Sequence, residues 1–136
     1  MIQKSGCILI NLSQKKIALV CRDGGYSFPK GHLKKDETLI ECAIREIKEE
    51  TGHNCHLVGD KEISIIHYNN SKGEKVENYF YLAIDDGITK DEINENDTEK
   101  TEWIKYSDVE NTLSYQNLKD FWNEIKFEVK RVMSSE

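Results

Sequence analysis

Short segments in which apolar and polar residues alternate, or in which apolar and aromatic residues run together, recur along the chain and predict strands. The first two, residues 5–10 and 17–21, are separated by a polar stretch at 13–15 and predict a strand pair. Further strands are expected at residues 26–28, within 55–68 as one long or two short strands with a bend near 59–60, at 76–84 and at 101–106. Few apolar residues occur between residues 85 and 102, where we expect a loop.

Other segments change to helical spacing. Thr38 and Glu41 form a capping-box pattern, and Gly52 is placed to end the helix that follows. A second capping box, at Ser107 and Glu110, predicts a brief helix. Apolar stripes that should face a core are Leu39, Ala43, Ile44 and Ile47 in the first helix, and Leu118, Phe121, Trp122, Ile125, Val129 and Val132 in a C-terminal helix. Strands with flanking helices predict an α/β fold.

The overall composition is that of a globular protein, and it narrows the possible partners. The chain has 136 residues, 38% hydrophobic and 32% charged, and we expect a single domain over residues 1–136. Its net charge is −6, whereas proteins that grip nucleic acid along its backbone normally have a basic face, so general nucleic-acid binding is not expected. Neither a run of 18 apolar residues nor a signal-peptide pattern occurs, so we expect no membrane partner.

The cysteines do not have the spacing of a metal site. Cys7, Cys21, Cys42 and Cys55 lack a C-x-x-C pair and lie in or beside apolar segments. Cysteines of this kind are typically buried, reduced thiols rather than zinc ligands or halves of disulfides. We therefore expect a cytoplasmic protein.

The first predicted helix concentrates carboxylates on one face. Glu46, Glu49 and Glu50 are spaced i, i+3 and i+4, which brings their Cβ atoms to roughly 5–6 Å from one another. Carboxylates this close repel each other unless water or a cation neutralises them. All-oxygen ligands suit Mg²⁺ or Mn²⁺ rather than zinc. Gly31 lets the backbone approach closely, so its carbonyl is a further candidate ligand.

An arginine within the same helix is a candidate for holding this arrangement in place. Arg45 is always charged, and its guanidinium can grip the carboxylate of Glu37 through two parallel hydrogen bonds. Such a pair would tie the loop before the helix to the helix itself.

Residues 31–53, GHLKKDETLIECAIREIKEETGH, resemble the signature of the Nudix hydrolases, G-x5-E-x7-R-E-U-x-E-E-x-G-U with U apolar. Only His53 departs from it, where the family prefers Ile, Leu or Val. The resemblance implies an α/β/α sandwich with a mixed β-sheet, and a hydrolase that uses Mg²⁺, or Mn²⁺ as a substitute. It also implies roles for single residues: metal ligands at Gly31, Glu46, Glu49 and Glu50, catalysis by these glutamates, and support from Glu37 and Arg45.

Weaker matches outside this segment are similar to the diadenosine tetraphosphate hydrolases of the same family. They comprise residues 27–32, SFPKGH, residues 75–82, KVENYFYL, and Tyr68, although Tyr26 replaces a usual tryptophan. This resemblance implies substrate-binding roles for Lys30, His32, Lys75, Tyr79 and Tyr81, with one of the tyrosines stacked on adenine. It also implies a remote catalytic acid, for which Asp97 is the first candidate and Glu95 and Glu99 are alternatives.

The sequence therefore predicts a Mg²⁺-dependent pyrophosphohydrolase that cleaves a phosphoanhydride bond of a small nucleotide with metal-activated water. The expected substrate is a dinucleoside polyphosphate such as diadenosine tetraphosphate, which would give ATP and AMP. Alternatives are a nucleoside triphosphate pyrophosphatase that removes 8-oxo-dGTP from the nucleotide pool, and a nucleotide-sensing domain without catalysis. Capped RNA ends, diphosphoinositol polyphosphates and ADP-ribose are further substrates to consider. Whether the protein is a monomer or a dimer is left open.

Overall fold

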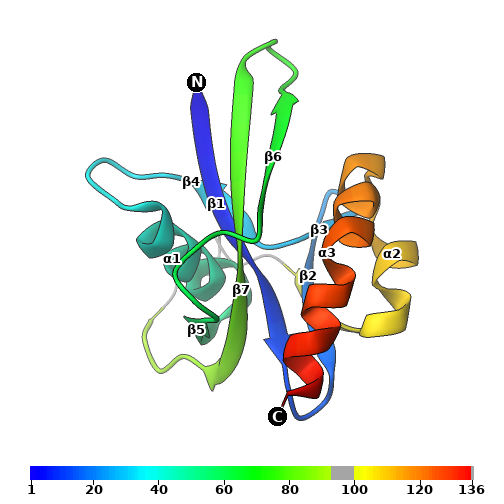
Figure 1. Cartoon of the computed structure of the whole chain (residues 1–136). Coiled ribbons are helices and arrows are strands. Elements are labelled where there is room, and N and C mark those ends of the chain that lie inside the picture. The colour runs from blue at the N-terminus through cyan, green and yellow to red at the C-terminus, as the bar shows by residue number, and fades with distance from the viewer. Residues whose placement is uncertain (93–99, 136) are drawn as a thin grey trace.

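The computed structural model describes residues 1–92 and 100–135, and within them a mixed eight-stranded sheet carries helices on both faces (Figure 1). The strands are β1 (Ile2–Asn11), β2 (Lys16–Arg22), β3 (Gly25–Ser27), β4 (Lys30–His32), β5 (His53–Leu57), β6 (Ser64–Asn69), β7 (Lys75–Ile88) and β8 (Lys100–Lys105). The helices are α1 (Leu39–Thr51), a 3₁₀ turn (Tyr106–Asp108), α2 (Val109–Thr112) and α3 (Gln116–Ser134). The expected mixed sheet between helical layers is confirmed.

The centre of the sheet is a long parallel pair. β1 and β7 run side by side from the pair Ile2–Val76 to the pair Ile10–Ile84. All other pairings are antiparallel: β1 with β2 and β4, β2 with β3 and β8, and β7 with β5 and β6. β1 therefore joins both halves of the sheet. The expected strand pair at the N-terminus is present, and the segment 55–68, expected to hold one long strand or two short ones, divides into the two strands β5 and β6.

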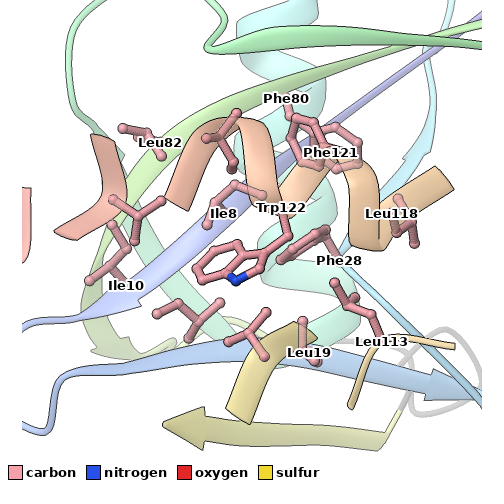
Figure 2. Close-up of a cluster of buried hydrophobic side chains, with 14 of the residues drawn as sticks. Ile8, Ile10, Leu19, Phe28, Phe80, Leu82, Leu113, Leu118, Phe121 and Trp122 are labelled. Atoms are coloured by element: carbon pink, nitrogen blue, oxygen red, sulfur yellow. The ribbon is translucent and has the colours of Figure 1, made fainter. Parts of the chain in front are cut away.

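Packing of the core divides between the two faces of the sheet. The larger cluster lies between the sheet and α3, and Phe28 sits at its middle, with its ring 5.8 Å from that of Phe121, 5.9 Å from that of Phe80 and 6.2 Å from that of Trp122 (Figure 2). The smaller cluster lies between the sheet and α1 and consists of Cys7, Leu9, Ala18, Ala43, Ile47, Tyr81 and Ala83. The apolar stripe expected on α3 is confirmed, with Val132 at its partly buried edge.

The stripe expected on α1 is only partly correct. Ala43 and Ile47 are buried and Leu39 packs beside them, but Ile44 belongs to neither core cluster. Cys42 is fully buried instead. All four cysteines are free, with Cys7 and Cys42 buried and the other two half-buried. No helix in the described ranges 1–92 and 100–135 has the length and apolar character that crossing a membrane requires.

Strand β7 extends further than its composition predicts. It runs to Ile88, so the first part of the acidic segment that was expected to be a loop is strand. Asp85 explains the difference: it pairs with Cys55 of β5, its carboxylate accepts a hydrogen bond from Asn11 Nδ2 at 3.1 Å, and it lies 2.8 Å from His53 Nδ1. An acidic residue with two side-chain partners is accommodated in a strand that hydrophobic periodicity alone does not detect.

Two further elements differ from those predicted. Residues 30–32, where no strand was predicted, pair with β1 as β4. The capping box expected at Ser107 does not form, because residues 106–108 make a 3₁₀ turn and α2 begins only after it, with Asp108 at its N-cap and no side-chain capping bond. β4 matters for the site, since it carries Gly31.

Candidate functional site

Helix α1 is held at both ends by local interactions. The Thr38 hydroxyl accepts a hydrogen bond from the Glu41 N–H, and the Glu41 carboxylate accepts one from the Thr38 N–H, so the expected capping box is present. Gly52 ends the helix in the left-handed conformation at φ 76°. These caps fix the start and the end of the helix on which the candidate carboxylates lie.

Arg45 donates hydrogen bonds to several groups around the face of α1 that carries Glu46, Glu49 and Glu50. Its Nε and Nη2 donate to the two oxygens of Glu37 at 2.6 and 2.9 Å, which is the expected bidentate pair. Its Nη1 donates to Glu46 at 2.7 Å and to Glu49 at 3.0 Å. Its Nη2 also donates to the backbone carbonyl of His32 at 2.9 Å. One guanidinium thus links the loop before α1, strand β4 and two of the three candidate ligands.

The titration behaviour of these groups follows from their contacts. The hydrogen bonds from Arg45 lower the pKa of Glu37 from 4.5 to about 2, against the smaller opposing effect of burial. The same hydrogen bonds raise the pKa of Arg45. Burial raises the pKa of Glu46 in spite of its contact with Arg45. Glu37 is therefore a permanently charged anchor at neutral pH.

Glu50 occupies the most buried position among the three ligand candidates. Only 6% of the residue is exposed, and its Oε1 accepts a hydrogen bond from the backbone N–H of Lys30 at 2.8 Å. The next residue, Gly31, lies against Glu46: a Cβ at Gly31 would be 2.1–2.3 Å from the atoms of the Glu46 carboxyl group. Only glycine fits here while Glu46 keeps this position. Strand β4 and α1 are therefore in direct contact through their functional groups.

These groups line a cavity of about 530 Å³, which we call the carboxylate cleft. Its lining comprises Arg22, Lys30, Gly31, His32, Leu33, Lys34, Arg45, Glu46, Glu49 and Glu50. Within residues 1–92 and 100–135, no three Asp, Glu, His or Cys side chains converge on one point, since Arg45 lies between Glu46 and Glu49. The donor set nevertheless fits Mg²⁺ or Mn²⁺, because it is made of carboxylate oxygens and the backbone of Gly31 lies directly against one of them. A bound cation would compete with Arg45 for the same oxygens.

A second cavity of about 440 Å³ adjoins the first, and we call it the sheet cavity. Arg22, Lys30, Gly31, His32 and Glu50 line both cavities. The sheet cavity is lined in addition by Lys4, Val20, Asp23, Gly25, Ser27, Ile66, Tyr68, Asn78, Tyr115, Asn117 and Leu118. The two cavities together therefore extend from the carboxylates of α1 to the N-terminal end of α3.

A single row of cross-strand neighbours crosses the sheet cavity. Lys4 of β1 is paired with His32 of β4 on one side and with Asn78 of β7 on the other, and Asn78 is paired with Ile66 of β6. Paired residues of neighbouring strands project from the same face of a sheet, so these four side chains lie side by side. Along the row, the basic side chains of His32 and Lys4 are followed by the amide of Asn78 and the aliphatic side chain of Ile66.

Positive charge gathers at the end of the row near the carboxylate cleft. Burial and the proximity of Arg22 lower the pKa of Lys4. Burial and the proximity of Lys4 and Lys30 lower the pKa of His32. Lys4, Arg22 and Lys30 bring positive charge to this part of the cavity, which favours an anion there. Lys30 and His32 were expected to bind substrate, whereas Lys4 and Arg22 were not foreseen.

The residue after Lys4 in the row, Asn78, has a buried side-chain amide. Asn78 is 2% exposed, and its Oδ1 has no hydrogen-bond partner among the residues that the structure describes. An unpaired buried acceptor costs roughly 1–3 kcal/mol, so its retention calls for an explanation. Tyr115 stands at the wall of the same cavity, where a Cβ at Gly25 would come within 2.6 Å of its hydroxyl.

Several residues expected at the site line neither cavity. Tyr79 and Tyr81 project to the α1 side of the sheet, where Tyr81 is buried in the smaller core cluster and Tyr79 packs against it. Lys75 is exposed at the start of β7, paired with Asn69. The proposed remote acid Asp97 and its alternatives Glu95 and Glu99 lie outside the described residues. The aromatic side chains of the sheet cavity are instead Tyr68 and Tyr115.

A sequence signal existed for two of the residues that were missed. Lys4 lies between Ile2 and the buried Gly6, Ile8 and Ile10 on alternate positions of β1, and Asn78 lies between Val76 and Phe80 on β7. A polar residue at a position where the alternation predicts an apolar, core-facing side chain is a candidate for a functional site. Neither Arg22 nor Tyr115 carries such a signal.

The chain matches known proteins in sequence and in fold. The model of the NUDIX domain matches residues 2–124, nearly the whole chain. The chain belongs to the Nudix family. Solved structures with the same fold include an Ap4A hydrolase from C. elegans (TM-score 0.71, 20% identity, 96% of this chain and 98% of that one) and a NUDIX-family hydrolase from Clostridium perfringens (TM-score 0.74, 17% identity, 93% and 97%).

Two curated relatives of this Nudix chain are longer proteins whose names refer to capped mRNA or to its decapping. The m7GpppN-mRNA hydrolase of Saccharomyces cerevisiae is 28% identical over 116 residues, which are 84% of this chain and 12% of that protein. The mRNA decapping complex subunit 2 of Schizosaccharomyces pombe is 43% identical over 53 residues, 37% of this chain and 7% of that protein. The chain thus spans about an eighth or less of the length of these relatives.

Proposed function

We propose that this Nudix domain hydrolyses a phosphoanhydride bond in a nucleotide whose phosphates join two nucleosides, such as diadenosine tetraphosphate. The observation that carries the proposal is the junction of the two cavities, which places an acidic cleft beside a cationic and partly apolar one. A polyphosphate needs both, since divalent cations and basic side chains share its charge while apolar surfaces receive the nucleoside.

The carboxylate cleft supplies the reacting centre in this proposal. Glu46, Glu49 and Glu50, with the carbonyl of Gly31, would hold Mg²⁺ or Mn²⁺, which when bound supplies a Lewis acid and a more acidic water. A carboxylate of the same set accepts the proton of the attacking water. Arg45 positions Glu46 and Glu49 and is itself kept in place by Glu37. This assignment agrees with the roles that the family resemblance implies.

The sheet cavity supplies the binding of the rest of the substrate. Lys4, Arg22 and Lys30 face the phosphate chain where it leaves the carboxylate cleft. Ile66, Tyr68 and Tyr115 offer apolar and aromatic surface for a nucleoside. This division replaces the earlier expectation that Tyr79 or Tyr81 stacks on the base.

A second candidate function has its own support. The relatives by sequence are named as an m7GpppN-mRNA hydrolase and, over 47 residues at 43% identity, as an RNA pyrophosphohydrolase of Xylella fastidiosa. A 5′ cap joins two nucleosides through phosphates just as diadenosine tetraphosphate does, so the same cleft chemistry would act on both. The net charge of −6 favours the free dinucleotide, because a long RNA needs a basic surface beyond the cleft.

Product analysis tests the proposal. Purified protein with Mg²⁺ is expected to release AMP and ATP from diadenosine tetraphosphate, with higher kcat/KM than for capped RNA, 5′-triphosphate RNA or 8-oxo-dGTP. Glu49→Gln and Glu50→Gln should reduce kcat on the order of 100-fold or more, since each removes a charged ligand, whereas Glu124→Gln on the exposed face of α3 should not. Faster cleavage of capped RNA would favour the second candidate, and silence on every substrate would refute both.

A further inference from the structure

We propose that Asn78 selects the nucleoside of the substrate by accepting a hydrogen bond from it, either from an amino group of the base or from a hydroxyl of the ribose. The inference rests on the proposed function, in which the sheet cavity receives a nucleotide. It starts from the fact that the Oδ1 of a 2% exposed side chain lining this cavity has no partner among the described residues.

The position of Asn78 in the sheet determines which part of a nucleotide reaches it. Its neighbour on β1 is Lys4, and its neighbour on β6 is Ile66, each about 5 Å away across the sheet. A phosphate at Lys4 and Arg22 brings the next groups of the nucleotide, the ribose and then the base, over Asn78 and Ile66. The nucleoside, rather than the phosphate chain, is therefore the partner in reach.

The hydrogen-bonding groups of the phosphate chain and of the nucleoside lead to the same assignment. Phosphate oxygens at neutral pH are acceptors and cannot satisfy an amide oxygen. The nucleoside carries donors, namely the 6-amino group of adenine and the 2′- and 3′-hydroxyls of ribose. A buried acceptor that pairs with one of these rejects an analogue that lacks it, because the acceptor is then left unpaired. Asn78 would thus discriminate among nucleotides without contacting the reacting phosphorus.

The backbone around Asn78 is rigid enough for such a role. β7 is paired on one side with β1 and on the other with β6 at this position. The residues two positions away on the same face, Val76 and Phe80, are 2% and 0% exposed and pack in the core. A polar group held between packed strands is pre-organised, which is the condition for selectivity.

Binding measurements on substrate fragments test the inference. The affinities of ADP, purine riboside 5′-diphosphate, 2′-deoxy-ADP and 3′-deoxy-ADP are measured by calorimetry, without added metal so that no turnover occurs. Wild-type protein is expected to bind one of these analogues about 10- to 100-fold more weakly than ADP. Loss with the purine analogue identifies the base amine, and loss with a deoxy analogue identifies that ribose hydroxyl.

Variants assign the preference to Asn78. Asn78→Leu removes the acceptor at similar volume and should bring the ratio of affinities close to one. Asn78→Asp keeps an acceptor and should retain the preference. Asn69→Leu is the matched control, since Asn69 is exposed on the neighbouring strand β6 and does not line the cavity, and its ratio should equal that of wild type.

The results that would overturn the inference are separate from those that would overturn the proposed function. Equal binding of all four nucleotides by the wild type, or an unchanged ratio in a folded Asn78→Leu protein, refutes the role of Asn78. If Asn78→Leu does not fold, Asn78→Asp decides, because a ratio close to one in that variant, which keeps an acceptor, refutes the role of Asn78. A protein that shows the Asn78-dependent preference but hydrolyses none of the substrates above keeps this inference and loses the proposed catalysis.

Discussion

The guanidinium of Arg45 shows how much of the candidate site depends on a single residue. Its planar fork reaches Glu37, Glu46, Glu49 and the carbonyl of His32 at the same time. An ammonium group cannot reproduce this pattern, because it offers a point charge instead of a fork. The same hydrogen bonds therefore fix the positions of the carboxylates and stabilise the loop before α1.

Replacing Glu37 should reveal this contact as pH-dependent stability. The pKa of Glu37 in the folded protein is about 2, below its ordinary value of 4.5, so its contribution is complete above pH 4.5 and is lost as the pH falls toward 2. Glu37→Gln should therefore lower the free energy of unfolding at neutral pH, and the difference from wild type should shrink on acidification. Urea unfolding at several pH values measures this, with Glu124→Gln as control. A difference that is constant with pH would contradict the assignment.

A side chain added at Gly31 should lower the activity while leaving the stability nearly unchanged. A Cβ at Gly31 would clash with the end of a flexible side chain rather than with backbone, so Gly31→Ala is expected to displace the Glu46 carboxylate with little loss of stability. We expect kcat to fall about 10- to 100-fold, as for loss of one metal ligand's support, while the melting temperature stays within a few degrees. Gly31→Ala and Glu46→Gln should then be non-additive in kcat. Full additivity would show that the two residues act independently.

At the scale of single elements, α1 and α2 offer a matched pair for testing helix capping. Thr38 makes a capping box, whereas Ser107, at a similar sequence pattern, makes none. Thr38→Ala should lower the free energy of unfolding by about 1 kcal/mol, and Ser107→Ala should leave it nearly unchanged. Chemical denaturation of both variants measures the difference. Equal losses would mean that the hydroxyl of Thr38 does not cap α1 in solution.

Helix α1 and the sheet cavity show which features could be predicted from the sequence and which could not. α1 was predicted with its caps, its carboxylate face and the Arg45–Glu37 pair, because all of these signals lie within a few turns of one another. The sheet cavity was not, because Lys4 and Asn78 meet only through the pairing of distant strands, and Tyr115 reaches them only through the packing of α3 on the sheet. Alternation along β7 placed Tyr79 and Tyr81 on one face correctly, but alternation cannot tell which face of the sheet holds a cavity.

On the scale of the whole molecule, the sheet cavity is built by both helical layers. Glu50 from α1 and Leu118 from α3 line it from opposite sides of the sheet, so ligands bound there contact both halves of the fold. Phe28 directly follows β3 and packs against Phe121 and Trp122 of α3. The position of α3, although remote from the carboxylates, therefore shapes the sheet cavity at the end where Tyr115 and Leu118 line it.

Divalent cations should stabilise the folded protein as a whole. A ligand that binds only the folded state adds RT ln(1 + [L]/Kd), about 2.7 kcal/mol at a hundredfold excess over Kd, which raises the melting temperature by several degrees. Mg²⁺ or Mn²⁺ should give this shift in wild type and in Glu124→Gln, and a smaller one in Glu49→Gln and Glu50→Gln. Calorimetric melting with and without chelator measures it. An equal shift in all four proteins would place the bound cation elsewhere.

The parallel pairing of β1 with β7 also bears on how the protein is made. β1 is synthesised first, yet its long partner β7 follows some seventy residues later, with β4 and α1 in between. Closing so large a loop has an entropic cost that must be met before any long-range contact forms, so folding should be slow for a chain of this size. During translation one edge of β1 therefore stays unpaired until β7 has left the ribosome, and the face of β1 that packs against α3 stays uncovered until α3 follows.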